Sequence, residues 1–359
     1  MLPNIRLHIE GLDATSLNKS RIATLPDPQL ASLRIVNWNA SPQNLKSLKM
    51  MILSRAGLKT LHLEGSKIPI LEERDIMDNE RVSPIRKLVI RTMAWQFSPS
   101  KAASFFDWKC ITHLELFEID IGRFLFSVPP ESLTQVRTLV MRDGCKDPNM
   151  HETVDLLCNL LNKISGLVSL DLRARFNMDQ TIFAICGHGP TLRCLRLRGH
   201  KDEAKTKWHE LSTNCLKAVG VSCPNLMQLG IDVNIGSDPI ITALAGFRNL
   251  RRLAVFCKTE FRVPLKIDNV FQRDYMTKPE NLFRLDHNSY RLVDVTAGAW
   301  LASVRSAKVG SPFECVRIHV VYDRATSDDD DGPTVLELRS IRFQSSSSFA
   351  HLLSDEADL

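Results

Sequence analysis

Arginine recurs at one place of a repeated sequence phrase in the middle of the chain. The phrase has apolar residues at its first, fourth and sixth positions. Its seventh position is arginine in three successive copies, at Arg142, Arg173 and Arg198. The same copies add Arg175 at the ninth position and Arg196 at the fifth. A guanidinium binds a carboxylate or a phosphate through two parallel hydrogen bonds, so this spacing favours recognition of an anionic group.

These five arginines are the candidate partner-binding residues, and a network of local salt bridges is the alternative explanation. Neighbouring strands of a parallel sheet lie ~4.8 Å apart, and two like charges at that distance repel by ~1 kcal/mol even in water. Such a column therefore needs counter-charges. Either Asp143 and Asp171 neutralise it on a solvated strand face, or an acidic or phosphorylated peptide of a partner does.

Other residue types that could carry chemistry do not form a recognisable site. Cys186, His188, Cys194 and His200 are metal-ligating types, but their spacing is not that of a known zinc finger. The sequence has no Walker loop, no dinucleotide-binding glycine motif, and no zinc-protease or serine-hydrolase motif. We expect no metal, no cofactor and no enzymatic activity. The enzymatic alternative is a hydrolase whose site is assembled from residues distant in sequence.

The repeated phrase itself predicts the elements that must position the arginines. Ten copies start 24 to 34 residues apart, at Leu2, Leu30, Leu58, Ile85, Ile111, Val136, Leu167, Leu192, Leu226 and Leu250. The fourth and sixth positions fall on one face of a strand, and the fifth and seventh fall on the other. Segments with helical spacing lie between copies, as at Val154, Leu157 and Leu161.

This period and phrase resemble those of leucine-rich repeats. The resemblance implies an α/β solenoid with the shape of a horseshoe, in which parallel strands line the concave face and helices cover the convex face. A doubly wound α/β domain is the competing architecture, but it predicts irregular strand spacing and a glycine-rich loop after the first strand. We therefore expect the arginines on the concave face of a solenoid.

The phrase also predicts the domain organisation. One solenoid should cover residues 1–342, and the acidic tail at 343–359 should be disordered or loosely packed. Within the solenoid, residues 259–312 are expected to form one enlarged, irregular repeat with a long loop. That repeat ends in an amphipathic helix at 296–307, and a strand over 335–341 ends the sheet.

The ninth position of the phrase departs from the usual pattern of such repeats. Asparagine is the residue most often found after the strand, and in this chain only Asn234 conforms. Because an asparagine ladder satisfies backbone groups at the turn, we expect the strand exits to be irregular. The aromatic residues Trp95, Phe105, Phe106 and Trp108 are expected to pack on the helical side rather than to form a stacking platform.

Two segments resemble repeats of F-box/leucine-rich-repeat proteins, especially diverged fungal ones. Residues 211–231 match the cysteine-containing repeat, in which a helix ends in Cys-Pro before the strand. Residues 181–197 match a pattern of helix, His-Gly, Thr-Leu and strand. The resemblance implies the substrate receptor of an F-box-type ubiquitin ligase, with a Skp-type adaptor and a cullin as partners. An F-box is not visible in the chain, so this link needs one upstream.

Composition indicates which class of partner and which cellular compartment to expect. A net charge of +5 over 359 residues is only a mild basic excess, so nucleic acid is not an expected ligand. Nine cysteines without paired spacing favour a reducing compartment. No signal peptide or membrane span is visible. We expect a protein–protein interaction module in the cytoplasm or nucleus. The alternative to a ligase receptor is a non-degradative scaffold or inhibitor that binds one folded partner.

Overall fold

The chain forms two compact units, Met1–His209 (unit 1) and Glu210–Leu359 (unit 2). In this computed structural model the described residues are 5–10, 30–38, 57–65, 82, 84–92, 95, 98–100, 102, 106–143, 150–174, 176–199, 211–233, 238–258, 300–323 and 336–344.

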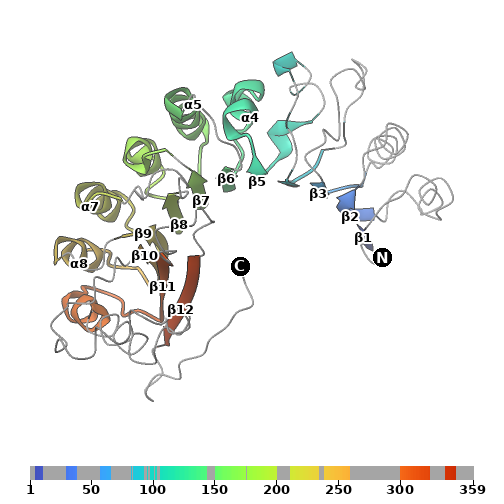
Figure 1. Ribbon diagram of the computed structural model, residues 1–359. Coiled ribbons are helices and arrows are strands. Elements are labelled where there is room, and N and C mark those ends of the chain that lie inside the picture. The colour runs from blue at the N-terminus through green and yellow to red at the C-terminus, as the bar shows by residue number, and fades with distance from the viewer. Residues whose placement is uncertain are drawn as a thin grey trace, which may run out of the picture. The chain divides into compact units, whose positions relative to one another are not determined.

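Unit 1 has eight described strands, and their order in space follows the sequence (Figure 1). Each strand pairs in parallel with the next one along the chain. The strands are β1 (Ile5–Glu10), β2 (Leu30–Trp38), β3 (Thr60–Gly65), β4 (Lys87–Arg91), β5 (His113–Ile119), β6 (Thr138–Asp143), β7 (Ser169–Ala174) and β8 (Cys194–Gly199).

The apolar positions of the phrase form the core of unit 1. From β2 to β8, every side chain at the fourth and sixth positions is 2% exposed or less. Equivalent positions also pair across the sheet, as Leu139 with Leu170 and Leu170 with Leu195. Each fully buried aliphatic side chain contributes roughly 1.5–3 kcal/mol. Burial of these two positions therefore turns the fifth and seventh positions to the opposite face.

A backbone ladder ties each copy of the phrase to the one before it at the second position. The amide of Arg137 donates to the carbonyl of Thr112 at 2.8 Å, that of Val168 to Arg137 at 2.8 Å, and that of Arg193 to Val168 at 2.9 Å. In unit 2 the amide of Arg251 donates to Met227 at 3.0 Å. Because the same bond recurs in both units, the phrase is the structural repeat.

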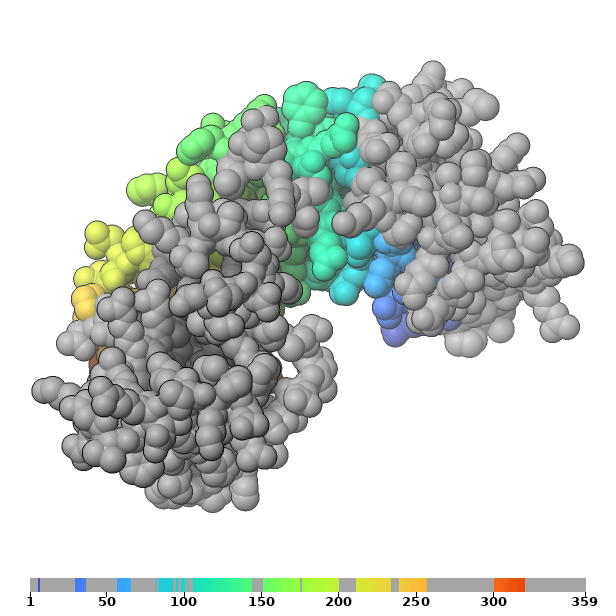
Figure 2. Space-filling view, in the orientation of Figure 1, coloured from blue at the N-terminus to red at the C-terminus, as the bar shows by residue number. Residues whose placement is uncertain are grey.

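Helices occupy the connections between strands of unit 1. Along the chain they are η4 (Trp108–Cys110), α4 (Ile121–Ser127), η5 (Pro130–Ser132), α5 (Met150–Lys163), η6 (Met178–Thr181) and α6 (Ile182–Cys186). The Asp120 carboxylate caps α4 by accepting a hydrogen bond from the Arg123 amide at 2.8 Å. Helices α4 and α5 pack together on one side of the strands, which leaves the fifth- and seventh-position side chains on the other. Figure 2 shows the surface of unit 1 in blue to green.

An aromatic cluster fills the space between the helical side and β4–β6. The rings of Trp95 and Phe124 lie 4.9 Å apart, and those of Trp108 and Phe124 lie 5.8 Å apart, both edge to face. The Trp95 indole donates to the Ser127 hydroxyl, and the Trp108 indole donates to the Ala102 carbonyl. The predicted packing role of these tryptophans is confirmed; Phe105 lies outside the described residues.

The strand exits of β4 and β5 are irregular. Thr92 and Glu118 both stand at the eighth position of the phrase and have a φ of 53°, a backbone conformation that residues other than glycine rarely adopt. The register of β5 against β6 also shifts between Phe117 and Ile119. The ninth-position residue Ile119 then turns inward and is 1% exposed. At these two strands the exits are irregular, as the missing asparagine predicts.

Unit 2 continues the phrase and then changes direction. Its described elements are α7 (Thr213–Ser222), β9 (Gln228–Asp232), α8 (Asp238–Ala245), β10 (Arg252–Lys258), β11 (Cys315–Asp323) and β12 (Leu336–Gln344). Strands β9, β10 and β11 are parallel neighbours, whereas β12 pairs antiparallel with β11. Residues 300–307 are helical and bury Trp300 and Val304. Most of the predicted enlarged repeat at 259–312 lies outside the described residues.

The predicted α/β leucine-rich-repeat solenoid architecture is confirmed in its essentials. Within each unit, successive copies of the phrase form parallel strands in register, and helices lie in the connections. The domain limits at 342 and 343–359 stay predictions, since residues 345–359 lie outside the described part of the chain. Among the described residues, no helix is long and apolar enough to span a membrane.

Candidate interaction surface

The seventh position of the phrase forms a continuous row of side chains across β4–β8. Arg91 pairs with Phe117, Phe117 with Arg142, Arg142 with Arg173, and Arg173 with Arg198. These five residues are called the arginine row below. Because the flanking sixth-position residues point into the core, the row lies on the face that the helices leave open.

Phe117 separates two arginines of the row and stacks with both. The Arg91 Cζ lies 4.0 Å from the centre of the Phe117 ring, and the Arg142 Cζ lies 5.0 Å from it. Each cation–π contact at a partly exposed site is worth ~0.5–1 kcal/mol. The aromatic ring therefore holds these two guanidiniums in place and keeps them apart.

Asp171 is the counter-ion of the row, and it serves two arginines at once. Its Oδ2 accepts from Arg142 Nη2 and from Arg196 Nη1, each at 3.1 Å. The side chain of Asp171 is 13% exposed, against 38% for Arg142 and 48% for Arg196. The carboxylate thus sits at the base of the surface with the two guanidiniums over it.

Arg173 differs from Arg142 and Arg196, because Asp171 binds both of those arginines. No carboxylate among the described residues lies within ion-pair distance of its guanidinium, and its buried Nε has no hydrogen-bond partner. Its neighbours in the row on both sides are arginines. A charged, partly buried group without a partner carries a desolvation cost, so Arg173 is the point of the row at which an anion would be most strongly favoured.

The structure accounts for four of the five predicted site residues. Arg142, Arg173 and Arg198 share the row, and Arg196 lies in the fifth-position row of the same face. Arg175 lies outside the described residues. The salt-bridge alternative is correct for Asp171, whose carboxylate binds Arg142 and Arg196. Whether these arginines bind a partner stays a prediction.

The same face carries opposite charges over β2–β5, and reasoning from sequence missed this balance. Glu64 Oε2 lies 3.6 Å from Arg34 Nη2, and Glu115 Oε1 lies 2.5 Å from Lys87 Nζ. Both carboxylates stand at the fifth or seventh position of their copies. Reading the third, fifth and seventh positions of adjacent copies together would have found these pairs, because the two members of each pair lie diagonally across neighbouring strands on the same face.

His62 lies within this balanced region and is neutral at neutral pH. Burial, and then the charges of Arg34 and Arg91, lower its pKa from 6.5 to about 4, although Glu64 acts in the opposite direction. Its Nε2 lies 3.4 Å from the Glu64 carboxylate. Because the imidazole is uncharged, this contact is not an ion pair near pH 7.

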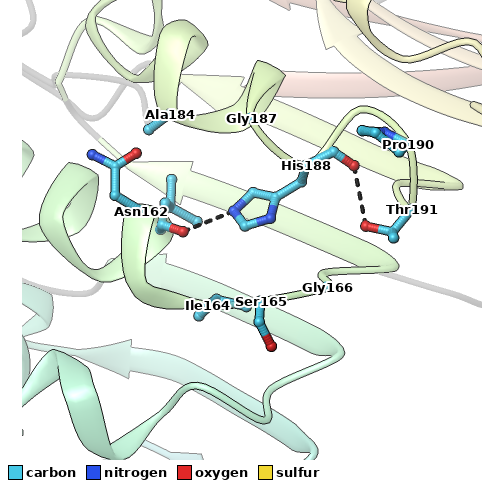
Figure 3. A pocket seen from close by; sticks show the side chains of 10 residues that line it. Asn162, Ile164, Ser165, Gly166, Ala184, Gly187, His188, Pro190 and Thr191 are labelled. Carbon is cyan, nitrogen blue, oxygen red and sulfur yellow. Dashed lines mark hydrogen bonds between the residues drawn. The ribbon is translucent and has the colours of Figure 1, made fainter.

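A pocket of about 320 Å³ lies on the helical side of unit 1, between the ends of α5 and α6 (Figure 3). His188 reaches into it and its Nε2 lies 2.8 Å from the Leu161 carbonyl. Burial lowers the pKa of His188 despite that hydrogen bond. The hydroxyl of Thr191 donates to the carbonyls of His188 and Leu167. These bonds close the end of α5, so the pocket has a structural explanation.

The cysteines and histidines that could have ligated a metal have separate structural places. Cys186 ends α6, Cys194 begins β8 and His188 bonds to α5. Among the described residues, no three His, Cys, Asp or Glu side chains form a group suited to hold a metal ion. His200 lies outside those residues.

Comparisons with known proteins add little to this picture. No family model matches the chain, and no curated protein is significantly similar in sequence. A solved structure, the leucine-rich repeat-containing protein LegL7 from Legionella pneumophila, is similar with a TM-score of 0.37 and 16% identity. The match covers 69% of this chain and 80% of that one. The assignment of the fold rests on the order and register of the strands themselves.

Proposed function

We propose that this chain is a non-catalytic protein-interaction module that binds an anionic segment of a partner protein on the arginine row. The observation that carries this proposal is Arg173, whose guanidinium lies between two further arginines of the row and has no counter-ion in the described part of the chain. Two pairs of like charges on strands ~4.8 Å apart each oppose folding by at most ~1 kcal/mol in water. An anionic ligand would remove that cost, since Arg binds carboxylates and phosphates with two parallel hydrogen bonds.

A protein segment fits this face better than a nucleic acid does. Glu64 and Glu115 lie on the same face as the row, and Asp171 lies within its basic part. The net charge of the chain is only +5. A polyanionic strand laid across β3–β8 would meet Glu64 and Glu115, whereas a short acidic segment over β6–β8 would meet only Asp171, which already binds two arginines.

Charge reversal tests the proposal directly. The probe is a library of peptides with fixed Asp and Glu positions, compared with a library in which Asn and Gln replace them. The wild-type protein should retain the acidic library, and a variant with Arg142→Glu, Arg173→Glu and Arg198→Glu should not. A circular dichroism melt should show that the variant remains folded with nearly unchanged thermal stability.

Arg193→Glu is the matched control for that experiment. Arg193 is exposed and precedes β8, at the opposite end of the strand from Arg198. The control makes one charge reversal outside the row and should leave retention of the acidic library unaltered. Equal retention by the wild type and the triple variant would sink the proposal.

Within this class, we propose that the protein is the substrate receptor of an F-box-type ubiquitin ligase. What supports this finer role is the resemblance of residues 181–197 and 211–231 to repeats of that family. The test is co-purification of the full-length protein with a Skp-type adaptor and a cullin. Absence of both partners, together with a stable complex whose partner keeps its half-life on deletion, would favour a scaffold or inhibitor instead.

A further inference from the structure

We infer that the arginine row contains a seat for one phosphate group, centred on Arg173, and that the ligand is a phosphorylated side chain of the partner protein. This inference rests on the proposed function and deepens it, because the partner segment is assigned a phosphomonoester rather than carboxylates alone. Three features of β6–β8 support it: the local charge, the spacing of the guanidiniums and the way in which the neighbours of Arg173 are held.

The local charge matches a phosphate dianion. Strands β6, β7 and β8 carry four arginines, Arg142, Arg173, Arg196 and Arg198, and two aspartates, Asp143 and Asp171. The balance is therefore two positive charges over the three strands. A phosphomonoester carries about −1.5 to −2 near pH 7. A single carboxylate, with one negative charge, would leave the seat positive.

The spacing of the row suits an anion with several oxygens. Arg142, Arg173 and Arg198 stand at paired positions on three adjacent strands, so their Cα atoms follow each other at ~4.8 Å. A phosphate presents three strong acceptor oxygens, so it can receive the fork of Arg173 and one donor from a neighbour on each side. A carboxylate has only two oxygens, so it offers fewer acceptor sites to three neighbouring guanidiniums than a phosphate does.

Two arginines near Arg173, Arg142 and Arg196, are held in place before any ligand binds. The Arg142 guanidinium bonds to Asp171 and lies 5.0 Å from the centre of the Phe117 ring. Arg196 bonds to the same oxygen of Asp171. The Arg173 guanidinium makes no ion pair among the described residues, and its Nε has no hydrogen-bond partner. Prior ordering lowers the entropy cost of binding, so Asp171 is a positioning residue and Arg173 is the ligand-contacting one.

The surroundings of the seat favour a single phosphorylated residue over a polyphosphate or a nucleic acid. The row continues from Arg142 to Phe117, which is uncharged, and the balanced pairs of Glu115 and Glu64 lie beyond it. A chain of phosphates that extended past β6 would meet these two carboxylates. One phosphate on a protein segment meets none of them.

The experiment uses three randomised peptide libraries that differ only at a fixed central residue, which is phosphoserine, glutamate or serine. Binding to the full-length protein is measured by fluorescence anisotropy at constant ionic strength. We expect the phosphoserine library to bind at least about tenfold more tightly than the glutamate library. A charge-assisted hydrogen bond is worth about 1.5–3 kcal/mol, so Arg173→Gln should weaken phosphoserine binding roughly 10- to 100-fold.

Three further variants distinguish the contact made by Arg173 from its charge and from effects on folding. Arg173→Lys keeps the positive charge but loses the planar fork, so it should lose much of the preference for phosphoserine over glutamate. Arg193→Gln, outside the row, should bind like the wild type. Asp171→Asn should weaken phosphoserine binding several-fold by releasing Arg142 and Arg196, and the loss should be smaller than that of Arg173→Gln.

Each outcome decides between the two proposals. Equal binding of the phosphoserine and glutamate libraries, with loss in Arg173→Gln, overturns the phosphate seat and leaves the anionic-segment function standing. Absence of binding to both libraries overturns both. Tighter binding of a single-stranded oligonucleotide than of the phosphoserine library, with the same dependence on Arg173, overturns the assignment to a protein ligand.

Discussion

The outward face of unit 1 is charge-balanced over β2–β5 and unbalanced over β6–β8. In the first region Arg34 lies 3.6 Å from Glu64, and Lys87 lies 2.5 Å from Glu115. In the second region Asp171 serves two arginines and Arg173 has no counter-ion among the described residues. Both regions consist of parallel strands in which the same phrase positions are buried, so the repeat fold does not dictate the charge of this face.

This contrast distinguishes surface residues that stabilise the repeat fold from surface residues that do not and are therefore candidates for binding. Balanced pairs on an exposed face each contribute at most ~1 kcal/mol, so β2–β5 follow what stability alone would favour. Arg173 opposes stability without contributing to the core, because it lies between two arginines and has no counter-ion among the described residues. Residues that a fold tolerates against its own stability are candidates for binding, because natural proteins violate local rules mainly at functional sites.

The largest effect is expected when the seventh position of β3, which is glutamate, is replaced by arginine, the residue at the seventh position of β7. Glu64→Arg removes the counter-ion of Arg34 and places a third positive charge beside Arg91, its neighbour in register. We expect a loss of about 2 kcal/mol in the free energy of unfolding, from lost attraction and new repulsion. Urea denaturation followed by circular dichroism measures it. Glu64→Gln, the neutral control, should lose less than half as much.

Acid should weaken the balanced region through His62. The folded protein holds the pKa of His62 at about 4, below the 6.5 of an unperturbed imidazole. The unfolded chain therefore binds a proton first, and the contribution of neutral His62 is lost as pH falls from about 6.5 to about 4. The free energy of unfolding is compared at pH 7 and at pH 4.5. We expect its decrease to be on the order of 1–2 kcal/mol smaller in His62→Gln than in the wild type. Parallel stability–pH curves for the two proteins would contradict this.

The opposite exchange should repair the unbalanced region. Arg173→Glu replaces two repulsions, with Arg142 and Arg198, by two attractions along the row. The introduced glutamate also lies two residues from Asp171 on the same face of β7 and repels it. The net gain in the free energy of unfolding should therefore be only about 1 kcal/mol, while binding of anionic peptides is lost. Stability is read from the urea midpoint and binding from anisotropy. A destabilised but folded Arg173→Glu protein would show that Arg173 has a structural role.

Salt provides the smallest and most selective effect. Ions screen charges at the surface, with a Debye length of about 10 Å at 0.1 M and 3 Å at 1 M. The stability gap between wild type and Arg173→Glu should therefore shrink to a few tenths of a kcal/mol in 1 M NaCl. A gap that persists would mean that packing, and not charge repulsion, distinguishes the two proteins.

Much of the fold follows from the phrase, and the part that does not has a physical reason. Leu139, Leu170 and Leu195 stand at one phrase position, so their burial and pairing could be predicted from spacing alone. The antiparallel pairing of β12 with β11 could not, because a strand adjacent in sequence can return in either direction. The inward turn of Ile119 depends on the strained φ of Glu118, which the residue types do not reveal.

The same distinction applies to the candidate site, whose residue positions follow from the sequence and whose side-chain contacts do not. The sequence by itself determined that Arg142, Arg173 and Arg198 share a row, because side chains alternate along a strand and equal phrase positions meet across parallel strands. Only the tertiary structure decided that Asp171 serves Arg142 and Arg196, that Phe117 holds Arg142, and that Arg173 is left without a counter-ion. Register sets the distance between Cα atoms, whereas an ion pair depends on where long side chains come to rest against their neighbours.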